Sequence, residues 1–249
     1  MKKLLRSWSV GGLATLVLTG VGLLAPLSAE ALPEDQIVDK LQQVPVFLIL
    51  NSEGQPLTAA ASADAAEVKV PVVFLDGETA QEFLEQAQQE DANAQVALVD
   101  LGTLFQETQS QETGPAPVMY FPEEDELTAA ATIQDDFRGV PLFFARRGED
   151  GPYLTITQDG VSSLPMFFSR QDLQTLITRY TQENPGEARA IAIEVLSLEW
   201  LLAAMATSDD PQLDEQLQRI RLFPSSEVLQ YLRSQQQEQS TRPATSSQR

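Results

Sequence analysis

The chain of 249 residues contains no cysteine and no histidine, and these two absences exclude much of the chemistry that proteins use. Without histidine it lacks the commonest general base and the commonest zinc ligand. Without cysteine it has no thiol nucleophile, no thiolate metal site, no residue to carry an N-terminal lipid and no disulfide. Its stability must therefore come from a packed hydrophobic core.

Positive charge is also scarce, with 16 Lys+Arg against 36 Asp+Glu and a net charge of −20. Three of those cations and one of those acids lie in the first 31 residues, so the remainder carries 13 cations and 35 acids. Nucleic acids and anionic lipids are bound by clustered cations. The composition therefore argues against both partners and suits a freely diffusing protein, or one that docks on basic partners.

The amino terminus has the pattern of an export signal. Lys2, Lys3 and Arg6 precede an apolar run over residues 10–24, and Ala29 and Ala31 fit the cleavage site of a signal peptidase. The run is shorter than the ~20 residues that a membrane-spanning helix needs, which makes an uncleaved anchor the weaker alternative. We therefore predict a signal peptide over residues 1–31. Its bacterial style predicts the periplasm, or the thylakoid lumen if the organism is photosynthetic.

The body of the chain reads as a duplication. Four segments share an aliphatic residue, a proline and three apolar residues, a pattern typical of mostly buried strands that begin at proline. The first and third are 96 residues apart and the second and fourth 94; at the 94-residue spacing, Asp100 also matches Glu194. The segments are Val44–Leu48, Val70–Phe74, Val140–Phe144 and Leu164–Phe168.

Between and after these strands, apolar residues recur at helical spacing over 78–89 and 170–181. Each half then reads strand, turn, strand, helix, strand, helix. The predicted fold class is α/β (α+β), a single pseudo-symmetric domain of two duplicated β-β-α-β-α halves that share one core, followed by C-terminal helices. The expected parts are a first half at 32–105, a connector at 106–134, a second half at 135–207, C-terminal helices at 208–233 and a disordered tail at 234–249.

A search for reactive groups predicts no catalytic residue, no metal site and no cofactor, and so no enzyme. The sequence has no glycine-rich phosphate loop and no nucleophile elbow, and neither Lys40 nor Lys69 lies near a serine motif. The acidic run over residues 123–126 lacks the spacing of a calcium loop, so we expect a solvated loop there. Asp100 and Glu194 are expected to cap helices, although a functional role stays open.

Apolar clusters are the remaining candidates for a site. Neighbours in a strand point to opposite faces, so each Phe-Phe pair sends one ring to each side of its sheet. The core interpretation is favoured, and exposure as a groove that binds unfolded clients is the alternative. The candidate client-binding residues are Met119, Tyr120, Phe121, Phe143, Phe144, Phe167 and Phe168.

The exported acidic chain with its duplicated Val-Pro-Val-Phe and Leu-Pro-Met-Phe-Phe segments resembles the Tic22-like family, named for a component of the translocon at the inner envelope of chloroplasts. The likeness rests on residues 41–54, on 70–75 with the following helix, and on 140–176. It implies a pseudo-symmetric fold with hydrophobic pockets on its two sides, a chaperone-like role and no catalytic residue. Cyanobacterial members are associated with the periplasm and thylakoids.

Together these observations predict a periplasmic chaperone-like factor that supports outer-membrane protein biogenesis or protein translocation. Its expected partners are unfolded or translocating proteins, such as outer-membrane β-barrel clients, or the barrel assembly machinery. The alternative is an envelope or thylakoid scaffold that binds one folded partner without chaperone activity. Suppression of aggregation of many clients would support the first function, and a single saturable partner would support the second.

Overall fold

The computed structural model describes residues 32–60, 68–109, 117–148, 151–187 and 191–241. The predicted signal peptide and the last eight residues lie outside these ranges. The first half comprises α1 (Glu34–Leu41), β1 (Pro45–Leu50), β2 (Thr58–Ala60), β3 (Lys69–Phe74), α2 (Gly77–Glu90), β4 (Gln95–Asp100) and α3 (Leu101–Gln109), followed by β5 (Met119–Phe121) and α4 (Glu124–Ala131).

The second half repeats this order. It comprises β6 (Pro141–Arg147), β7 (Ile156–Gln158), β8 (Val161–Phe167), α5 (Arg170–Glu183), a 3₁₀ turn (Pro185–Glu187), β9 (Ile191–Ser197) and α6 (Leu198–Thr207), followed by α7 (Pro211–Arg219), β10 (Ile220–Phe223) and α8 (Ser226–Thr241). None of the helices in the described ranges is both long enough and apolar enough to cross a membrane.

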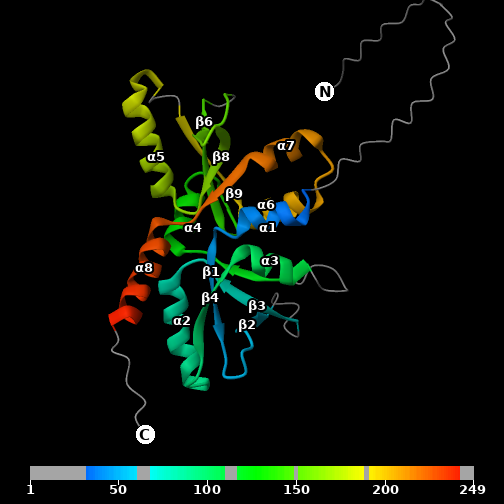
Figure 1. Ribbon diagram of the computed structural model, residues 1–249, viewed down its shortest axis with the longest axis vertical. Helices are drawn as coiled ribbons and strands as arrows, with labels where there is room; N and C mark the ends of the chain where they lie inside the picture. Colours follow the sequence, from blue (N-terminus) through cyan, green and yellow to red (C-terminus); the bar gives the residue numbers. More distant parts are fainter. Residues whose placement is uncertain (1–31, 61–67, 110–116, 149–150, 188–190, 242–249) are drawn as a thin grey trace, which may run out of the picture.

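The two sheets have the same connectivity. In the first, β1 pairs antiparallel with β3 and β4, and β3 also pairs with β2 and, in parallel, with β5. In the second, β6 pairs antiparallel with β8 and β9, and β8 also pairs with β7 and, in parallel, with β10. The predicted duplication is confirmed, with one sheet above the other in Figure 1.

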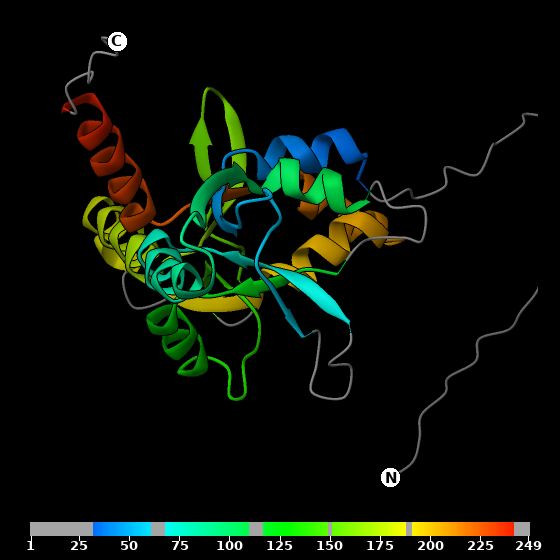
Figure 2. The ribbon, with the colours of Figure 1, turned by 90° about the horizontal axis from the view of Figure 1, so that it is seen from below.

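A shared central cluster joins the halves, as predicted. Helices α1, α3, α6 and α7 lie together on one side of the molecule (Figures 1 and 2) and pack on the inner faces of both sheets. The outer face of each sheet has its own cluster, under α2 and α8 in the first half and under α4 and α5 in the second. Proline begins β1 and β6, where no ladder donor is required, as the sequence indicates.

Strand pairing corrects the spacing of the repeat. Phe47 pairs with Phe74, whereas Phe143, which is 96 residues after Phe47, pairs with Phe167, which is 93 residues after Phe74. The helices that follow, α2 and α5, start 93 residues apart and both have 14 residues. The predicted 94-residue offset for this part of the chain is therefore wrong by one.

The offset of 94 matches Pro71 with Pro165, and these two prolines are not equivalent. Pro71 is the third residue of β3 and Pro165 the fifth residue of β8, so neither begins its strand as expected. Since a shift of one residue turns a side chain to the other face, the face that must be buried decides the register. At an offset of 93, Phe74 and Phe167 both lie in the outer clusters, as equivalent positions should.

The third matched block is shifted as well. Pro45 pairs with Asp100 and Pro141 with Ser197, so Asp100 corresponds to Ser197 and not to Glu194. Both residues accept a hydrogen bond from a backbone N–H in the first turn of the following helix, at 2.8 and 3.2 Å. The capping role predicted for Asp100 is confirmed, and the one predicted for Glu194 is wrong because that residue lies within β9.

The chain beyond each half is more ordered than predicted. The connector holds the end of α3, the strand β5 and the helix α4, and the C-terminal helices are separated by β10. The disordered tail expected from Ser234 is wrong as far as Thr241, because α8 continues to that residue. Docking of its first two turns through Val228 and Tyr231 supplies the stability that the polar sequence lacks.

Helices α4 and α8 cross between the halves. After β5 in the first sheet, α4 packs on the second sheet; after β10 in the second sheet, α8 packs on the first. Figure 2 shows α8 beside α2. A Cβ on Gly77 of α2 would lie 2.4 Å from the Tyr231 ring, so the close approach of α8 requires glycine there. This reciprocal exchange makes each half depend on the other.

Candidate binding groove

An apolar groove opens on the outer side of the first half, between α2 and the strands β2, β3 and β5. We call it the α2–β5 groove. Its cavity volume is about 340 Å³, and its lining residues are Leu57, Thr58, Ala59, Val72, Phe83, Gln86, Ala87, Glu90, Met119 and Phe121.

Three phenylalanine rings form one end of the groove. Phe74 of β3 is fully buried, and its ring centroid lies 5.1 Å from that of Phe83 on α2 and 5.5 Å from that of Phe121 on β5. The Phe83 and Phe121 rings meet nearly edge to face at 5.0 Å. Phe121 remains 36% exposed, so this aromatic surface is open to a ligand.

Negative charge borders the groove. Helix α2 carries Glu78, Glu82, Glu85 and Glu90 and no basic residue, and Glu90 itself lines the cavity. The groove therefore combines apolar surface with one negative charge at its border, which complements a basic residue on a ligand.

The structure separates the three predicted residues of β5. Because β5 pairs in parallel with β3, Met119 and Phe121 face the outer side and line the groove. Tyr120 faces the opposite way and packs against the central cluster. Burial, and then the nearby carboxylate of Glu199, raises the pKa of Tyr120. Tyr120 thus belongs to the interior of the described structure.

The other four candidates are buried, and none is more than 9% exposed. Phe143 and Phe167 lie in the outer cluster of the second half, and Phe144 and Phe168 in the central cluster, so each pair does send one ring each way. In this conformation they fill the core, as the favoured interpretation held, and offer no open surface.

Sequence reasoning missed Phe83 and Ala87 as groove residues. Both lie on the apolar stripe of α2, for which the sequence predicted a helix and no binding role. The signal in the sequence was the width of the apolar stripe. Only Gly77, Ala80 and Leu84 of α2 are buried, so Phe83 and Ala87 extend the stripe beyond the surface that the core covers. The strand β5 was also missed, because three residues are too few for a periodic pattern.

The equivalent place in the second half is filled. Arg221 on β10 corresponds to Met119 on β5. Met119 pairs with the residue of β3 that lies two positions before Phe74, and Arg221 pairs with the residue of β8 that lies two positions before Phe167. Its guanidinium lies 5.3 Å from the centroid of the Phe223 ring and donates a hydrogen bond to Gln158. The Phe223 ring stacks on Phe167 at 4.9 Å.

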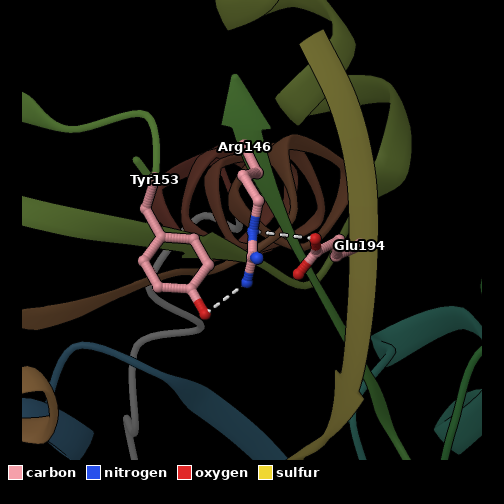
Figure 3. Close-up of polar contacts among 3 residues, drawn as sticks. All are labelled: Arg146, Tyr153 and Glu194. Atoms are coloured by element: carbon pink, nitrogen blue, oxygen red, sulfur yellow. Dashed lines mark hydrogen bonds and ion pairs between the residues drawn. The ribbon is translucent and has the colours of Figure 1, made fainter. Parts of the chain in front are cut away.

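A polar contact also distinguishes the inner face of the second sheet. Arg146 forms an ion pair with Glu194 at 2.9 Å and donates to the Tyr153 hydroxyl at 2.7 Å, with its guanidinium 4.5 Å from the centre of that ring. Figure 3 shows Arg146 between the two partners. Leu50 and Ala97 occupy the positions of Arg146 and Glu194 in the first half. The three side chains contact one another, which indicates a structural contact.

The acidic run over residues 123–126 is not the solvated loop that we expected. It forms the start of α4, where Glu126 accepts a hydrogen bond from the Arg170 N–H at 2.9 Å. Burial, and then the nearby Glu227 carboxylate, raises the pKa of Glu123 to about 7. Among the described residues, no three acidic groups are arranged to hold a metal ion.

The two lysines outside the N-terminal segment, Lys40 and Lys69, differ in their surroundings. Lys40 donates to the carbonyl oxygens of Gln218 at 2.6 Å and Ile220 at 3.1 Å, where it fixes α1 to the end of α7. Burial lowers the pKa of Lys40. Lys69 begins β3 and is exposed.

Comparisons with known proteins agree with this architecture. The model of the Tic22-like family matches residues 10–234. The solved structure of Anabaena Tic22, described as a protein of protein transport, is similar with a TM-score of 0.65 and 24% identity, over 82% of this chain and 97% of that one. Tic22 from Plasmodium falciparum is similar with a TM-score of 0.57 and 19% identity, over 81% of this chain and 98% of that one. No curated protein matches the chain.

Proposed function

Because the chain belongs to the Tic22-like family, we propose that it is an exported protein-transport factor that holds unfolded clients in the α2–β5 groove. The main support for the proposal is the groove itself, in which Met119 and the partly exposed ring of Phe121 are accessible on an acidic protein. The described structure offers a surface to bind an apolar segment.

The predicted signal peptide supports export to the periplasm, with the thylakoid lumen as the alternative. Suitable clients are outer-membrane β-barrel proteins on their way through that compartment, or other translocating chains. The high negative charge keeps a complex with such a client in solution. Glu90, the one charged residue among the described residues that line the groove, favours client segments with a basic flank.

Binding energy in the groove suits transient holding. Burial of about 300 Å² of apolar client surface contributes several kcal/mol at ~25 cal/mol per Å². Ordering the client offsets much of this gain, which leaves a dissociation constant in the micromolar range. Release then needs no nucleotide, in keeping with a sequence that has no phosphate-binding loop.

The test compares two matched substitutions. Phe121→Ala removes the exposed ring of the groove, and Phe223→Ala removes the equivalent ring of the second half. We expect the wild type and Phe223→Ala to suppress aggregation of an unfolded outer-membrane barrel protein without ATP, and Phe121→Ala to lose most of this activity. Circular dichroism checks that both variants stay folded.

Equal activity of the two variants would exclude the groove as the client site. If the wild type suppresses no aggregation and instead binds one folded envelope protein with saturable stoichiometry, the scaffold alternative replaces the chaperone proposal.

A further inference from the structure

A second apolar cavity lies in the other half of the molecule, at the C-terminal end of β9. It has a volume of about 340 Å³ and is bounded by β9, the start of α6 and the turn that precedes β6. Phe137, Val195 and Leu196 supply apolar surface, and Trp200 and Arg138 also line it. We call it the β9 pocket.

Trp200 is the most unusual residue of this pocket. It is 50% exposed, although its neighbours Leu198, Leu201 and Leu202 on α6 are buried in the central cluster. The packing of α6 therefore does not need this ring. A half-exposed tryptophan beside an apolar cavity is typical of an anchor for a binding partner.

The strand that leads to the pocket offers backbone groups as well. Among the described strands, β9 pairs with β6 alone along its seven residues. An unpaired edge accepts an extended polypeptide as an additional strand. Since α6 begins directly after Ser197, this edge ends at the β9 pocket.

The charge at the pocket selects which end of a polypeptide fits there. Arg138 is the only charged residue among those described that line it, in a chain of net charge −20. A cation at the end of a strand edge attracts the α-carboxylate of a partner and repels an α-amino group. The first half has Gln42 and Thr103 at the positions of Arg138 and Trp200, so it offers neither contact.

We propose that the β9 pocket binds the carboxyl-terminal end of an extended polypeptide. The terminal apolar side chain lies against Trp200, the α-carboxylate pairs with Arg138, and the preceding residues add to the edge of β9. This site is separate from the α2–β5 groove. It binds the end of a polypeptide chain, whereas the groove binds an internal apolar segment.

Tryptophan fluorescence tests the proposal directly. The chain has two tryptophans, and Trp8→Phe in the full-length protein leaves Trp200 as the only one. The probes are two peptides of about ten residues with alternating apolar and polar side chains and a C-terminal phenylalanine. One peptide ends in a free carboxylate and the other in an amide. We expect the free acid to shift the Trp200 emission to shorter wavelength with a micromolar dissociation constant, and the amide to bind about tenfold more weakly.

Two variants complete the test. Arg138→Gln should weaken binding of the acid about tenfold and remove the discrimination between acid and amide, and Arg138→Lys should retain part of it. Phe121→Ala, which removes a ring of the α2–β5 groove, should bind the acid as tightly as the protein without this substitution does. No emission change with the free acid, equal binding of acid and amide, or loss of acid binding in Phe121→Ala would each overturn the proposal.

Discussion

The two halves share their strand order, their paired 14-residue helices and the caps of α3 and α6, but they differ where the last strand joins each sheet. In the first half, β5 brings Met119 and Phe121 to an open groove. In the second half, β10 brings Arg221 and Phe223, and these close the equivalent surface by stacking. The inner faces must match because they form one core, whereas the outer faces are free to diverge. Divergence there gives one fold two different surfaces.

The largest expected effect comes from the shared core. Leu101 and Leu198 are equivalent and fully buried. Their backbone N–H groups donate hydrogen bonds to the carbonyl oxygens of Val44 and Val140, each at 2.8 Å. Truncating either to alanine should lower the free energy of unfolding by about 2–5 kcal/mol. Because the central cluster spans both halves, calorimetry should show a single transition that moves as a whole. Two separated transitions, with only one moved by each variant, would show that the halves fold independently.

Titration of Glu123 should change the free energy of unfolding by about 1 kcal/mol, a smaller effect. This figure allows for the partial exposure of the Glu123 side chain. Its pKa is about 7 in the folded protein and has its ordinary value near 4.5 in the unfolded chain. The folded state therefore holds a proton that the unfolded state releases, and stability should fall as pH rises between these values. Ser225 occupies the equivalent position before α8.

Urea denaturation of Glu123→Gln across pH 4–8 checks this account. The variant should lose this part of the pH dependence and be more stable than the wild type at pH 8. A wild type whose stability rises over that window, with no change in the variant, would contradict the assigned cause.

The smallest effect is expected at the polar contact of the second sheet. Glu194→Ala, which introduces the residue of the first half at position 97, should cost at most about 1 kcal/mol, because the ion pair is partly exposed. Thermal unfolding in low and high salt measures it, and the difference from wild type should shrink as salt is added. A large cost that salt leaves unchanged would indicate a role in packing instead.

Much of this architecture could be predicted from local signals in the sequence. Asp210 and Pro211 begin α7 as a cap and a first-turn proline, and the apolar stripes place α2 and α5 within two residues of their observed bounds. The four proline-led apolar segments locate the central strands of both sheets. Such features depend on neighbours in the chain, which the sequence displays directly.

The missed features depend on contacts between distant residues. The strands β5 and β10 have three and four residues, and their pairing with β3 and β8 is what defines them. The exchange of α4 and α8 between halves leaves no local pattern. For the candidate site, Met119 and Phe121 were identified as an apolar cluster, but their separation from Tyr120 became visible only with the strand register.

We propose that the first half binds clients through the α2–β5 groove and that Arg221 closes the equivalent surface of the second half. The decisive measurement exchanges the two equivalent residues: Met119→Arg and Arg221→Met are each titrated with a fluorescent unfolded barrel segment. Met119→Arg should abolish binding, and Arg221→Met should raise the stoichiometry from one segment to two. Unchanged binding in Met119→Arg would contradict the account.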